Sequence, residues 1–137
     1  MKESYSIEEI KIGMFESYSK TITDLDVQNF AKLSGDMNPV HLDEEYAEKS
    51  RFKKRIAHGL LSSSFFSAIF GTKLPGKGCV YVSQNLTFKR AVYLGDTVTA
   101  IATVTKIDLV KKRAFFDTKC FVKNKAVITG TAELYIP

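Results

Sequence analysis

The chain has 137 residues, enough for one domain with a sizeable buried core. Hydrophobic residues make up 45% of it and charged residues 26%, as in ordinary globular proteins. No apolar run reaches the roughly 20 residues that a bilayer-spanning helix needs, and the polar N-terminus with its glutamates does not resemble a signal peptide. We therefore expect a single domain over residues 1–137, located in the cytoplasm and without membrane contact.

The net charge of +5 raises the question of an anionic partner. The basic residues are spread, with small clusters at 53–55, 89–90 and 111–113, and no nucleic-acid-binding motif accompanies them. We predict no nucleic-acid partner, since the phosphates of a smaller nucleotide-bearing ligand would suit these clusters equally well. The two cysteines, Cys79 and Cys120, lack the spacing of a zinc site and are expected to be buried, reduced thiols.

Along the chain, residues 1–12 form an arm with no clear secondary-structure pattern, and alternation over residues 15–22 predicts a strand. Thr23 then reads as a helix N-cap, with Asp26 completing a capping box. The helix that follows is expected to end at residues 34–35 and to carry five apolar side chains: Leu25, Val27, Phe30, Ala31 and Leu33.

Residues 34–41 read Ser-Gly-Asp-Met-Asn-Pro-Val-His and are expected to form a bent loop rather than regular helix. Pro39 lacks an N–H and pushes Asn38 out of the helical region. On such a bend the carboxylate of Asp36 and the imidazole of His41 can converge from neighbouring positions. Asp43 is then expected to cap a short helix over residues 44–49.

Residues 58–70 read as a third helix, which carries no charged residue. Apolar residues cover most of its circumference, which predicts burial on nearly all sides. Gly59, at its start, would offer a free backbone N–H to a developing negative charge.

The rest of the chain predicts strands over residues 79–88, 97–110, 114–122 and 126–136. In the first of them one side is expected to carry four apolar residues, Val80, Val82, Leu86 and Phe88. Three long consecutive antiparallel strands and one buried helix indicate an α+β fold, in which a curved sheet wraps around that helix.

Two segments closely resemble one known family. FAKLSGDMNPVHLDEEYA, with its D-x-N-P-x-H loop, and RIAHGLLSSSFFSAIFGTKLPGKG, with its His-Gly pair, resemble the MaoC-like dehydratase family, and within it the single-domain (R)-specific enoyl-CoA hydratases. The resemblance covers about residues 13–137. It implies the hot-dog fold, an antiparallel sheet wrapped around a central helix, and a homodimer or higher homo-oligomer formed edge to edge.

The resemblance also implies an activity: reversible hydration of a trans-2-enoyl-CoA to an (R)-3-hydroxyacyl-CoA, in fatty-acid or polyhydroxyalkanoate metabolism, with no metal and no redox cofactor. Hydration needs a base for water, an acid for Cα and a polariser for the thioester carbonyl. Asp36 and His41 would activate the water and shuttle protons. The Gly59 N–H would polarise the carbonyl, and Ser67, aligned with a serine grouped with the catalytic pair, would hydrogen-bond Asp36.

The remaining site residues have supporting roles, and most have a purely structural alternative. Asn38 either orients the pair or only shapes the turn, while His58 is expected to be structural. Lys89 and Arg90 either meet the coenzyme A phosphates or are solvated surface charges. Gly59 could also serve only to let the helix start pack closely.

Three other functions compete with this interpretation. The substrate could be carried by acyl-carrier protein, which would make the protein a 3-hydroxyacyl-ACP dehydratase of fatty-acid synthesis. A hot-dog acyl-CoA thioesterase commonly places a carboxylate on the central helix, and residues 59–70 contain no Asp or Glu. A non-catalytic acyl-binding protein would be expected to lack Asp36 or His41, and both are present.

Overall fold

The computed structural model describes residues 2–137. Its elements, in chain order, are β1 (Phe15–Thr21), α1 (Asp24–Ser34), α2 (Pro39–Leu42), α3 (Glu44–Glu48), α4 (Gly59–Thr72), β2 (Val80–Gln84), β3 (Thr87–Phe88), β4 (Thr97–Asp108), β5 (Arg113–Val122) and β6 (Lys125–Tyr135). No helix among residues 2–137 has the length and apolar character needed to cross a membrane.

The strands form one antiparallel sheet in the order β1-β4-β5-β6-β2, with the short β3 also paired to β6. The three long strands predicted from the sequence are confirmed as β4, β5 and β6. Their inward residues alternate with outward ones, as a sheet with one covered face requires. In β4 the fully covered positions are Val98, Ala100, Ala102 and Val104.

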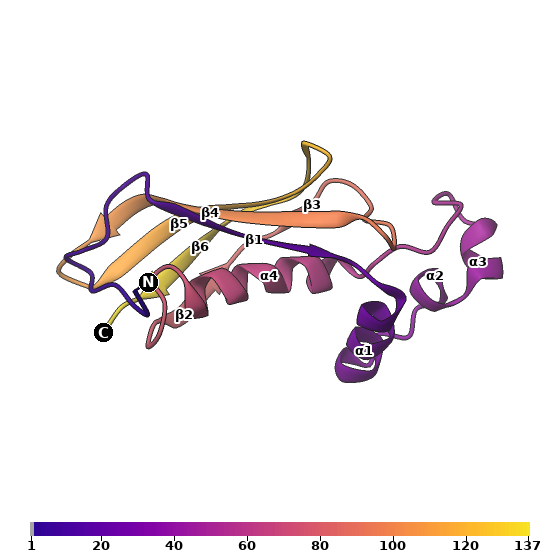
Figure 1. Ribbon diagram of the computed structural model, residues 1–137, viewed down its shortest axis with the longest axis horizontal. Helices are drawn as coiled ribbons and strands as arrows, with labels where there is room; N and C mark the ends of the chain where they lie inside the picture. The colour runs from indigo at the N-terminus through magenta and orange to yellow at the C-terminus, as the bar shows by residue number, and fades with distance from the viewer. Residues whose placement is uncertain (1) are drawn as a thin grey trace.

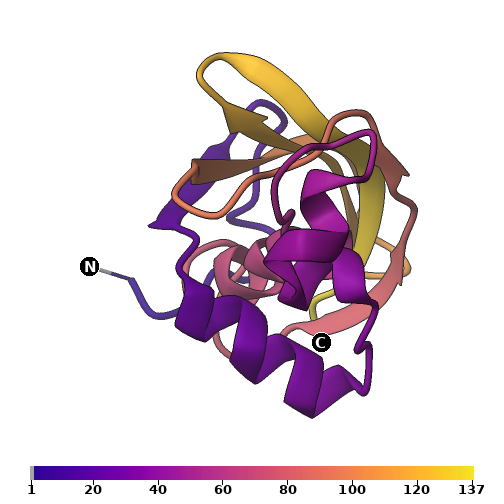
Figure 2. The same ribbon diagram turned by 90° about the vertical axis from the view of Figure 1, so that its right-hand side faces the viewer.

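Helix α4 runs along the concave face of this sheet (Figure 1), and the sheet curls around it when viewed from the end (Figure 2). Phe66, Ile69 and Phe70 are at most 1% exposed, and the Phe70 ring meets that of Phe116 on β5 edge to face at 4.8 Å. The expected α+β, hot-dog arrangement is therefore what the chain adopts.

The prediction that α4 is buried on nearly all sides was wrong for one face. Leu60 is 58% exposed, and Ser64 and Ser67 are also exposed. These positions recur every three or four residues, so they share one stripe of the helix. The sheet covers only the opposite side of α4.

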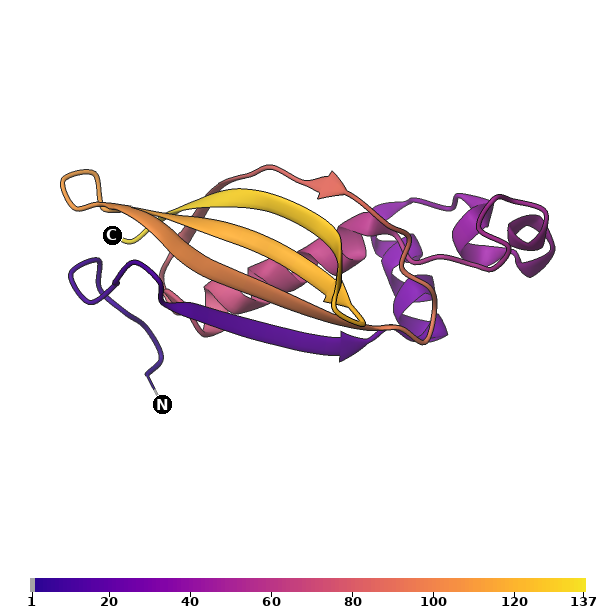
Figure 3. The same cartoon turned by 90° about the horizontal axis from the view of Figure 1, so that it is seen from above.

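The strand predicted over residues 79–88 is interrupted, and most of its apolar side chains are exposed. It splits into β2 and β3, and the pairing with β6 shifts register between Tyr81 and Ser83. Val80, Val82 and Phe88, which were predicted to share one side of a continuous strand, are 49%, 43% and 50% exposed. β2 lies at the edge of the sheet (Figure 3) and pairs only with β6, so its side chains have a neighbouring strand on one flank alone.

Helices α1, α2 and α3 project beyond the end of the sheet near the start of α4 (Figure 1). The Thr23 capping box with Asp26 and the Asp43 cap of α3 are both confirmed. Leu25 and Leu33, however, are 66% and 87% exposed, because α1 rests on the protein through only one narrow side. We refer to residues 24–57 as the projecting segment.

Both cysteines are free thiols, as predicted. Cys120 is fully buried and Cys79 is half-buried. Burial raises the pKa of the Cys120 thiol to about 12, so this thiol stays protonated.

Truncating a buried ring under α4 should test the core directly. Replacing Phe70 by Ala is expected to lower the free energy of unfolding by about 3–5 kcal/mol, because it leaves a cavity between α4 and the sheet. Urea unfolding followed by circular dichroism would measure this change. Val110→Ala, at a side chain that is 94% exposed, is the matched control and should change little. Equal losses in the two variants would contradict the packing described here.

Candidate active site

The Asp36 carboxylate is held by its own loop. Gly35 ends α1 with φ of 83°, a left-handed conformation that favours glycine, and this turns the chain sharply toward Asp36. The Asp36 N–H donates to Ser34 Oγ at 3.1 Å, and the Asn38 N–H donates to Asp36 Oδ1 at 3.1 Å. These bonds leave the second carboxylate oxygen available to a ligand.

His41 lies on α2, a single helical turn that the sequence interpretation had treated as irregular loop. Pro39 occupies the first position of this turn, where its missing N–H costs nothing. The Asn38 side chain accepts from the Val40 N–H at 3.2 Å and so caps the turn. This bond supports the turn-shaping role for Asn38.

The His41 ring is 8% exposed, and its Nδ1 lies 2.7 Å from the carbonyl oxygen of Ile56. A carbonyl oxygen can only accept, so Nδ1 carries the proton and Nε2 of the neutral ring is a free acceptor. The backbone of Ile56 therefore selects the tautomer of His41 that can serve as a base.

His58 lies beside both residues at the N-terminal end of α4. Its Nε2 donates to the backbone oxygen of Asp36 at 3.0 Å, and its ring stacks on that of His41 with centroids 3.8 Å apart. The ring is 3% exposed, and its Nδ1 has no partner among residues 2–137. These contacts fit the structural role expected for His58, since one ring supports both the Asp36 loop and His41.

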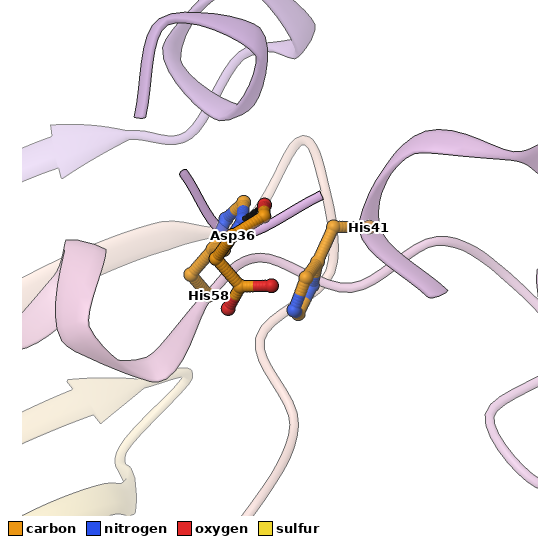
Figure 4. A group of neighbouring side chains, drawn as sticks. All are labelled: Asp36, His41 and His58. Carbon is orange, nitrogen blue, oxygen red and sulfur yellow. Dashed lines mark hydrogen bonds between the residues drawn. The ribbon is translucent and has the colours of Figure 1, made fainter. Parts of the chain in front are cut away.

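Figure 4 shows the Asp36 carboxylate pointing toward the His41 ring. One ligand atom from each of Asp36, His41 and His58 lies within 4.8 Å of the other two. Such a gap accommodates one water with a hydrogen bond of about 2.8 Å to each side. The two imidazole planes are inclined by 26° in their stack.

These residues open onto a cavity of about 550 Å³ between the projecting segment and the start of α4. Polar and charged groups gather at Asp36, His41, Arg51, Lys89 and Arg90. The remaining wall is largely apolar, as in sites that take an acyl chain, and includes Phe30, Phe52, Leu60, Phe88, Val92 and Ile128. Lys89 and Arg90 are exposed, so they lie where the cavity meets solvent.

Gly59 also lines this cavity, as the first residue of α4. The first N–H groups of a helix have no acceptor within the helix, and the preceding His58 side chain does not cap them. A Cβ on Gly59 would lie 2.5 Å from Cε1 of Phe88. The close contact with Phe88 therefore leaves no room for a side chain at this position.

Ser67 is the one predicted catalytic residue that the structure does not bring to this site. It lies eight residues beyond Gly59 along α4, about 12 Å by helical rise, on the exposed face. The cavity wall does not include it, and within residues 2–137 it makes no hydrogen bond to Asp36. Within residues 2–137 of one chain the expected bond to Asp36 is not formed, and the catalytic role of Ser67 stays a prediction.

The sequence interpretation missed the aromatic residues of the wall. Phe30 was counted only among the apolar residues of the first helix, and Phe88 among those on one side of a strand. Phe30 instead meets the His58 ring with centroids 4.8 Å apart, and Phe88 covers Gly59. No spacing signal identifies such residues, because they meet the site only through tertiary packing.

Burial lowers the pKa of His41 below its ordinary value of 6.5, although the bond to Ile56 and the Asp36 charge act in the opposite direction. The ring is therefore neutral at neutral pH. An unfolded chain would protonate His41 near pH 6.5, whereas the folded protein does so only at lower pH. His41 thus contributes stability that is complete above pH 6.5 and is lost as the pH falls through the lowered pKa.

Replacing His41 by Gln should remove this contribution. We expect the free energy of unfolding to fall less between about pH 7.5 and about pH 5 in the variant than in the wild type. Urea titrations at both pH values measure the difference. Identical pH dependence in the two proteins would show that His41 is not held neutral by burial.

The chain is similar to known proteins over nearly its whole length. The family profile described as MaoC like domain matches residues 9–131. An (R)-specific enoyl-CoA hydratase of Rhodospirillum rubrum is 51% identical over 95% of this chain and 90% of its own length. A mitochondrial 3-hydroxyacyl-[acyl-carrier-protein] dehydratase of Arabidopsis thaliana is 35% identical over 93% of the chain and 78% of its own length.

A solved structure described as an (R)-hydratase from A. caviae involved in PHA biosynthesis superimposes with a TM-score of 0.93. The two chains are 38% identical, and the match covers 95% of this chain and 99% of that one. Family profile, sequence relatives and fold all lead to one assignment: this chain belongs to the MaoC-like dehydratase family.

Proposed function

We propose that the protein is an (R)-specific enoyl-CoA hydratase, which adds water reversibly across the double bond of a trans-2-enoyl-CoA thioester. The observation that carries this proposal is the opposition of the Asp36 carboxylate and the His41 ring across a gap of at most 4.8 Å, in a cavity that also contains the Gly59 amide. The 51% identity to a hydratase supports the same reaction.

The pair would hold the reacting water. Asp36 and Nε2 of His41 each accept one of its hydrogen bonds, which directs a lone pair of the water oxygen at Cβ of the substrate. One of the two takes a proton as the C–O bond forms, and the double-bond electrons move to Cα and the thioester. The acid so formed then returns its proton to Cα, which completes the addition of one water.

Gly59 would stabilise the enolate between these two steps. Negative charge builds on the thioester oxygen, and a free N–H at the head of a 14-residue helix is a suitable donor for it. Phe88 lies against Gly59 and would keep water away from this hydrogen bond. A dry environment strengthens such a bond.

Lys89 and Arg90 support a coenzyme A thioester as substrate. Both are exposed beside the cavity, where phosphates of the carrier would lie while the acyl chain enters. Acyl-carrier protein remains the second candidate carrier, since the relatives include both CoA and carrier-protein enzymes. A thioesterase is disfavoured, because α4 carries no carboxylate.

The expected homodimer also belongs to this proposal. Edge strand β2 and the exposed stripe of α4 leave apolar side chains such as Val80, Val82 and Leu60 in contact with solvent. Pairing of two copies along this side would cover them. The cytoplasmic location and the absence of a cofactor stay predictions.

Asp36→Asn tests the proposed chemistry. The amide cannot take a proton, so hydration should slow by on the order of 10²-fold or more. The measurement is the loss of ultraviolet absorbance of crotonyl-CoA and of a longer enoyl-CoA, with chiral analysis of the product. Asp117→Asn, on the outward face of β5, is the matched control and should be as active as wild type. An inactive wild type with both substrates would refute the proposal.

Replacing Lys89 and Arg90 together by Gln tests the carrier contact. Each lost phosphate contact should raise KM for the CoA thioester roughly tenfold, with kcat nearly unchanged. The KM for the corresponding pantetheine thioester, which lacks the nucleotide phosphates, should not change. If both substrates lose affinity equally, these side chains do not meet the phosphates.

A further inference from the structure

Arg55 occupies an unexpected place in the projecting segment. The sequence puts it in a run of three basic residues, 53–55, that looked like solvated charge or a phosphate contact. In the structure its side chain is only 10% exposed, and it is absent from the cavity wall formed by residues 2–137. It points into the projecting segment instead of toward solvent or substrate.

The guanidinium joins three helices. Its Nε donates to the backbone oxygen of His41 on α2 at 2.7 Å, and Nη2 donates to Oδ1 of Asp24, the first residue of α1, at 2.6 Å. Nη1 lies 3.8 Å from Oε1 of Glu44, the first residue of α3. The planar fork of an arginine is the side chain suited to three such partners at once.

The turn that bears His41 needs outside support. α2 has four residues, and a single turn is not stable by itself. No N–H group within a helix donates to its last carbonyl oxygens. Arg55 supplies a donor for one of these in α2, the oxygen of His41. The neighbouring Ile56 donates its N–H to the Val40 oxygen at 3.3 Å, and its carbonyl oxygen accepts from Nδ1 of His41. Residues 55–56 thus hold the turn at its backbone and at its catalytic ring.

None of the hydrogen bonds of Asp36 within residues 2–137 involves Arg55. The Asp36 loop is fixed through Ser34, Asn38 and His58. A loss of the Arg55 contacts would therefore move His41 relative to Asp36, rather than move both together. The one-water gap between the two groups is what such a movement would alter.

We propose that Arg55 is a positioning residue for His41, which keeps the His41 ring in register with Asp36 by binding the backbone oxygen of His41 and anchoring it to α1 and α3. The inference rests on the proposed hydration reaction. It deepens that proposal by adding a residue that binds the backbone of His41 and, within residues 2–137, forms no hydrogen bond with Asp36. Arg55 contacts neither water nor substrate, so it acts only through His41.

Arg55→Met keeps the apolar stem and removes every donor. We expect kcat for enoyl-CoA hydration to fall roughly 10- to 100-fold, because a small misplacement of a catalytic group costs that much, while KM stays within about twofold. Arg55→Lys retains the charge and one donor but not the fork, so its kcat should be intermediate. Lys49→Met, which removes an exposed charge from the end of α3, is the matched control and should behave as wild type.

A second readout does not need enzymatic activity. The chain has two histidines, so ¹⁵N spectra of histidine-labelled protein contain two imidazole systems, which His58→Gln assigns. In the wild type His41 should show the Nδ1-protonated tautomer. In Arg55→Met it should become a mixture of tautomers, while the His58 signals stay in place.

The two measurements separate the outcomes. A preserved kcat, a rise in KM alone, or an unchanged His41 tautomer would each overturn the positioning role of Arg55. If the wild type shows no hydration at all, the proposed function fails, and the His41 tautomer still decides the role of Arg55. Thermal melting shows whether each variant is folded. If Arg55→Met is not, the kcat and the His41 tautomer of Arg55→Lys are compared with those of the wild type instead.

Discussion

The hydrogen bond between the His41 ring and the Ile56 carbonyl is the contact on which the site depends. It selects one tautomer and so makes Nε2 the available acceptor. It also ties the turn that bears His41 to the segment that leads directly into α4 and Gly59. One backbone segment, residues 55–58, therefore fixes the position of His41 and leads directly into the first residue of α4, Gly59.

Burial has two linked effects at this site. The same low-polarity surroundings that lower the pKa of His41 would strengthen a hydrogen bond from Gly59 to an enolate oxygen. Because its pKa is lowered, the His41 ring is unprotonated at neutral pH and can accept a proton from the reacting water. An apolar cavity thus serves the base, the proposed oxyanion donor and the acyl chain together.

The sheet acts as a rigid platform, and the projecting segment brings the catalytic groups to it. α4 is fixed by close contacts such as that between Phe70 and Phe116. α1 to α3 have little core of their own, as the exposure of Leu33 shows. Their arrangement is instead set by polar contacts: the Thr23 capping box, the Asp43 cap, the His58 bond to the Asp36 backbone and the three contacts of Arg55. Charge and hydrogen bonding replace apolar packing where the site is built.

The sequence by itself determined the three long strands, the central helix, both helix caps and the Asp36–His41 pair. Each of these follows from a local pattern: alternation, helical periodicity, a capping box, or a glycine and a proline that bend a short loop. It did not determine that Ser67 faces solvent, that Val80 and Val82 lie on an exposed edge, or that Arg55 turns inward to His41. Those outcomes depend on which neighbours the folded chain supplies from far along the sequence. A local pattern carries no information on such neighbours, so only the tertiary structure decided them.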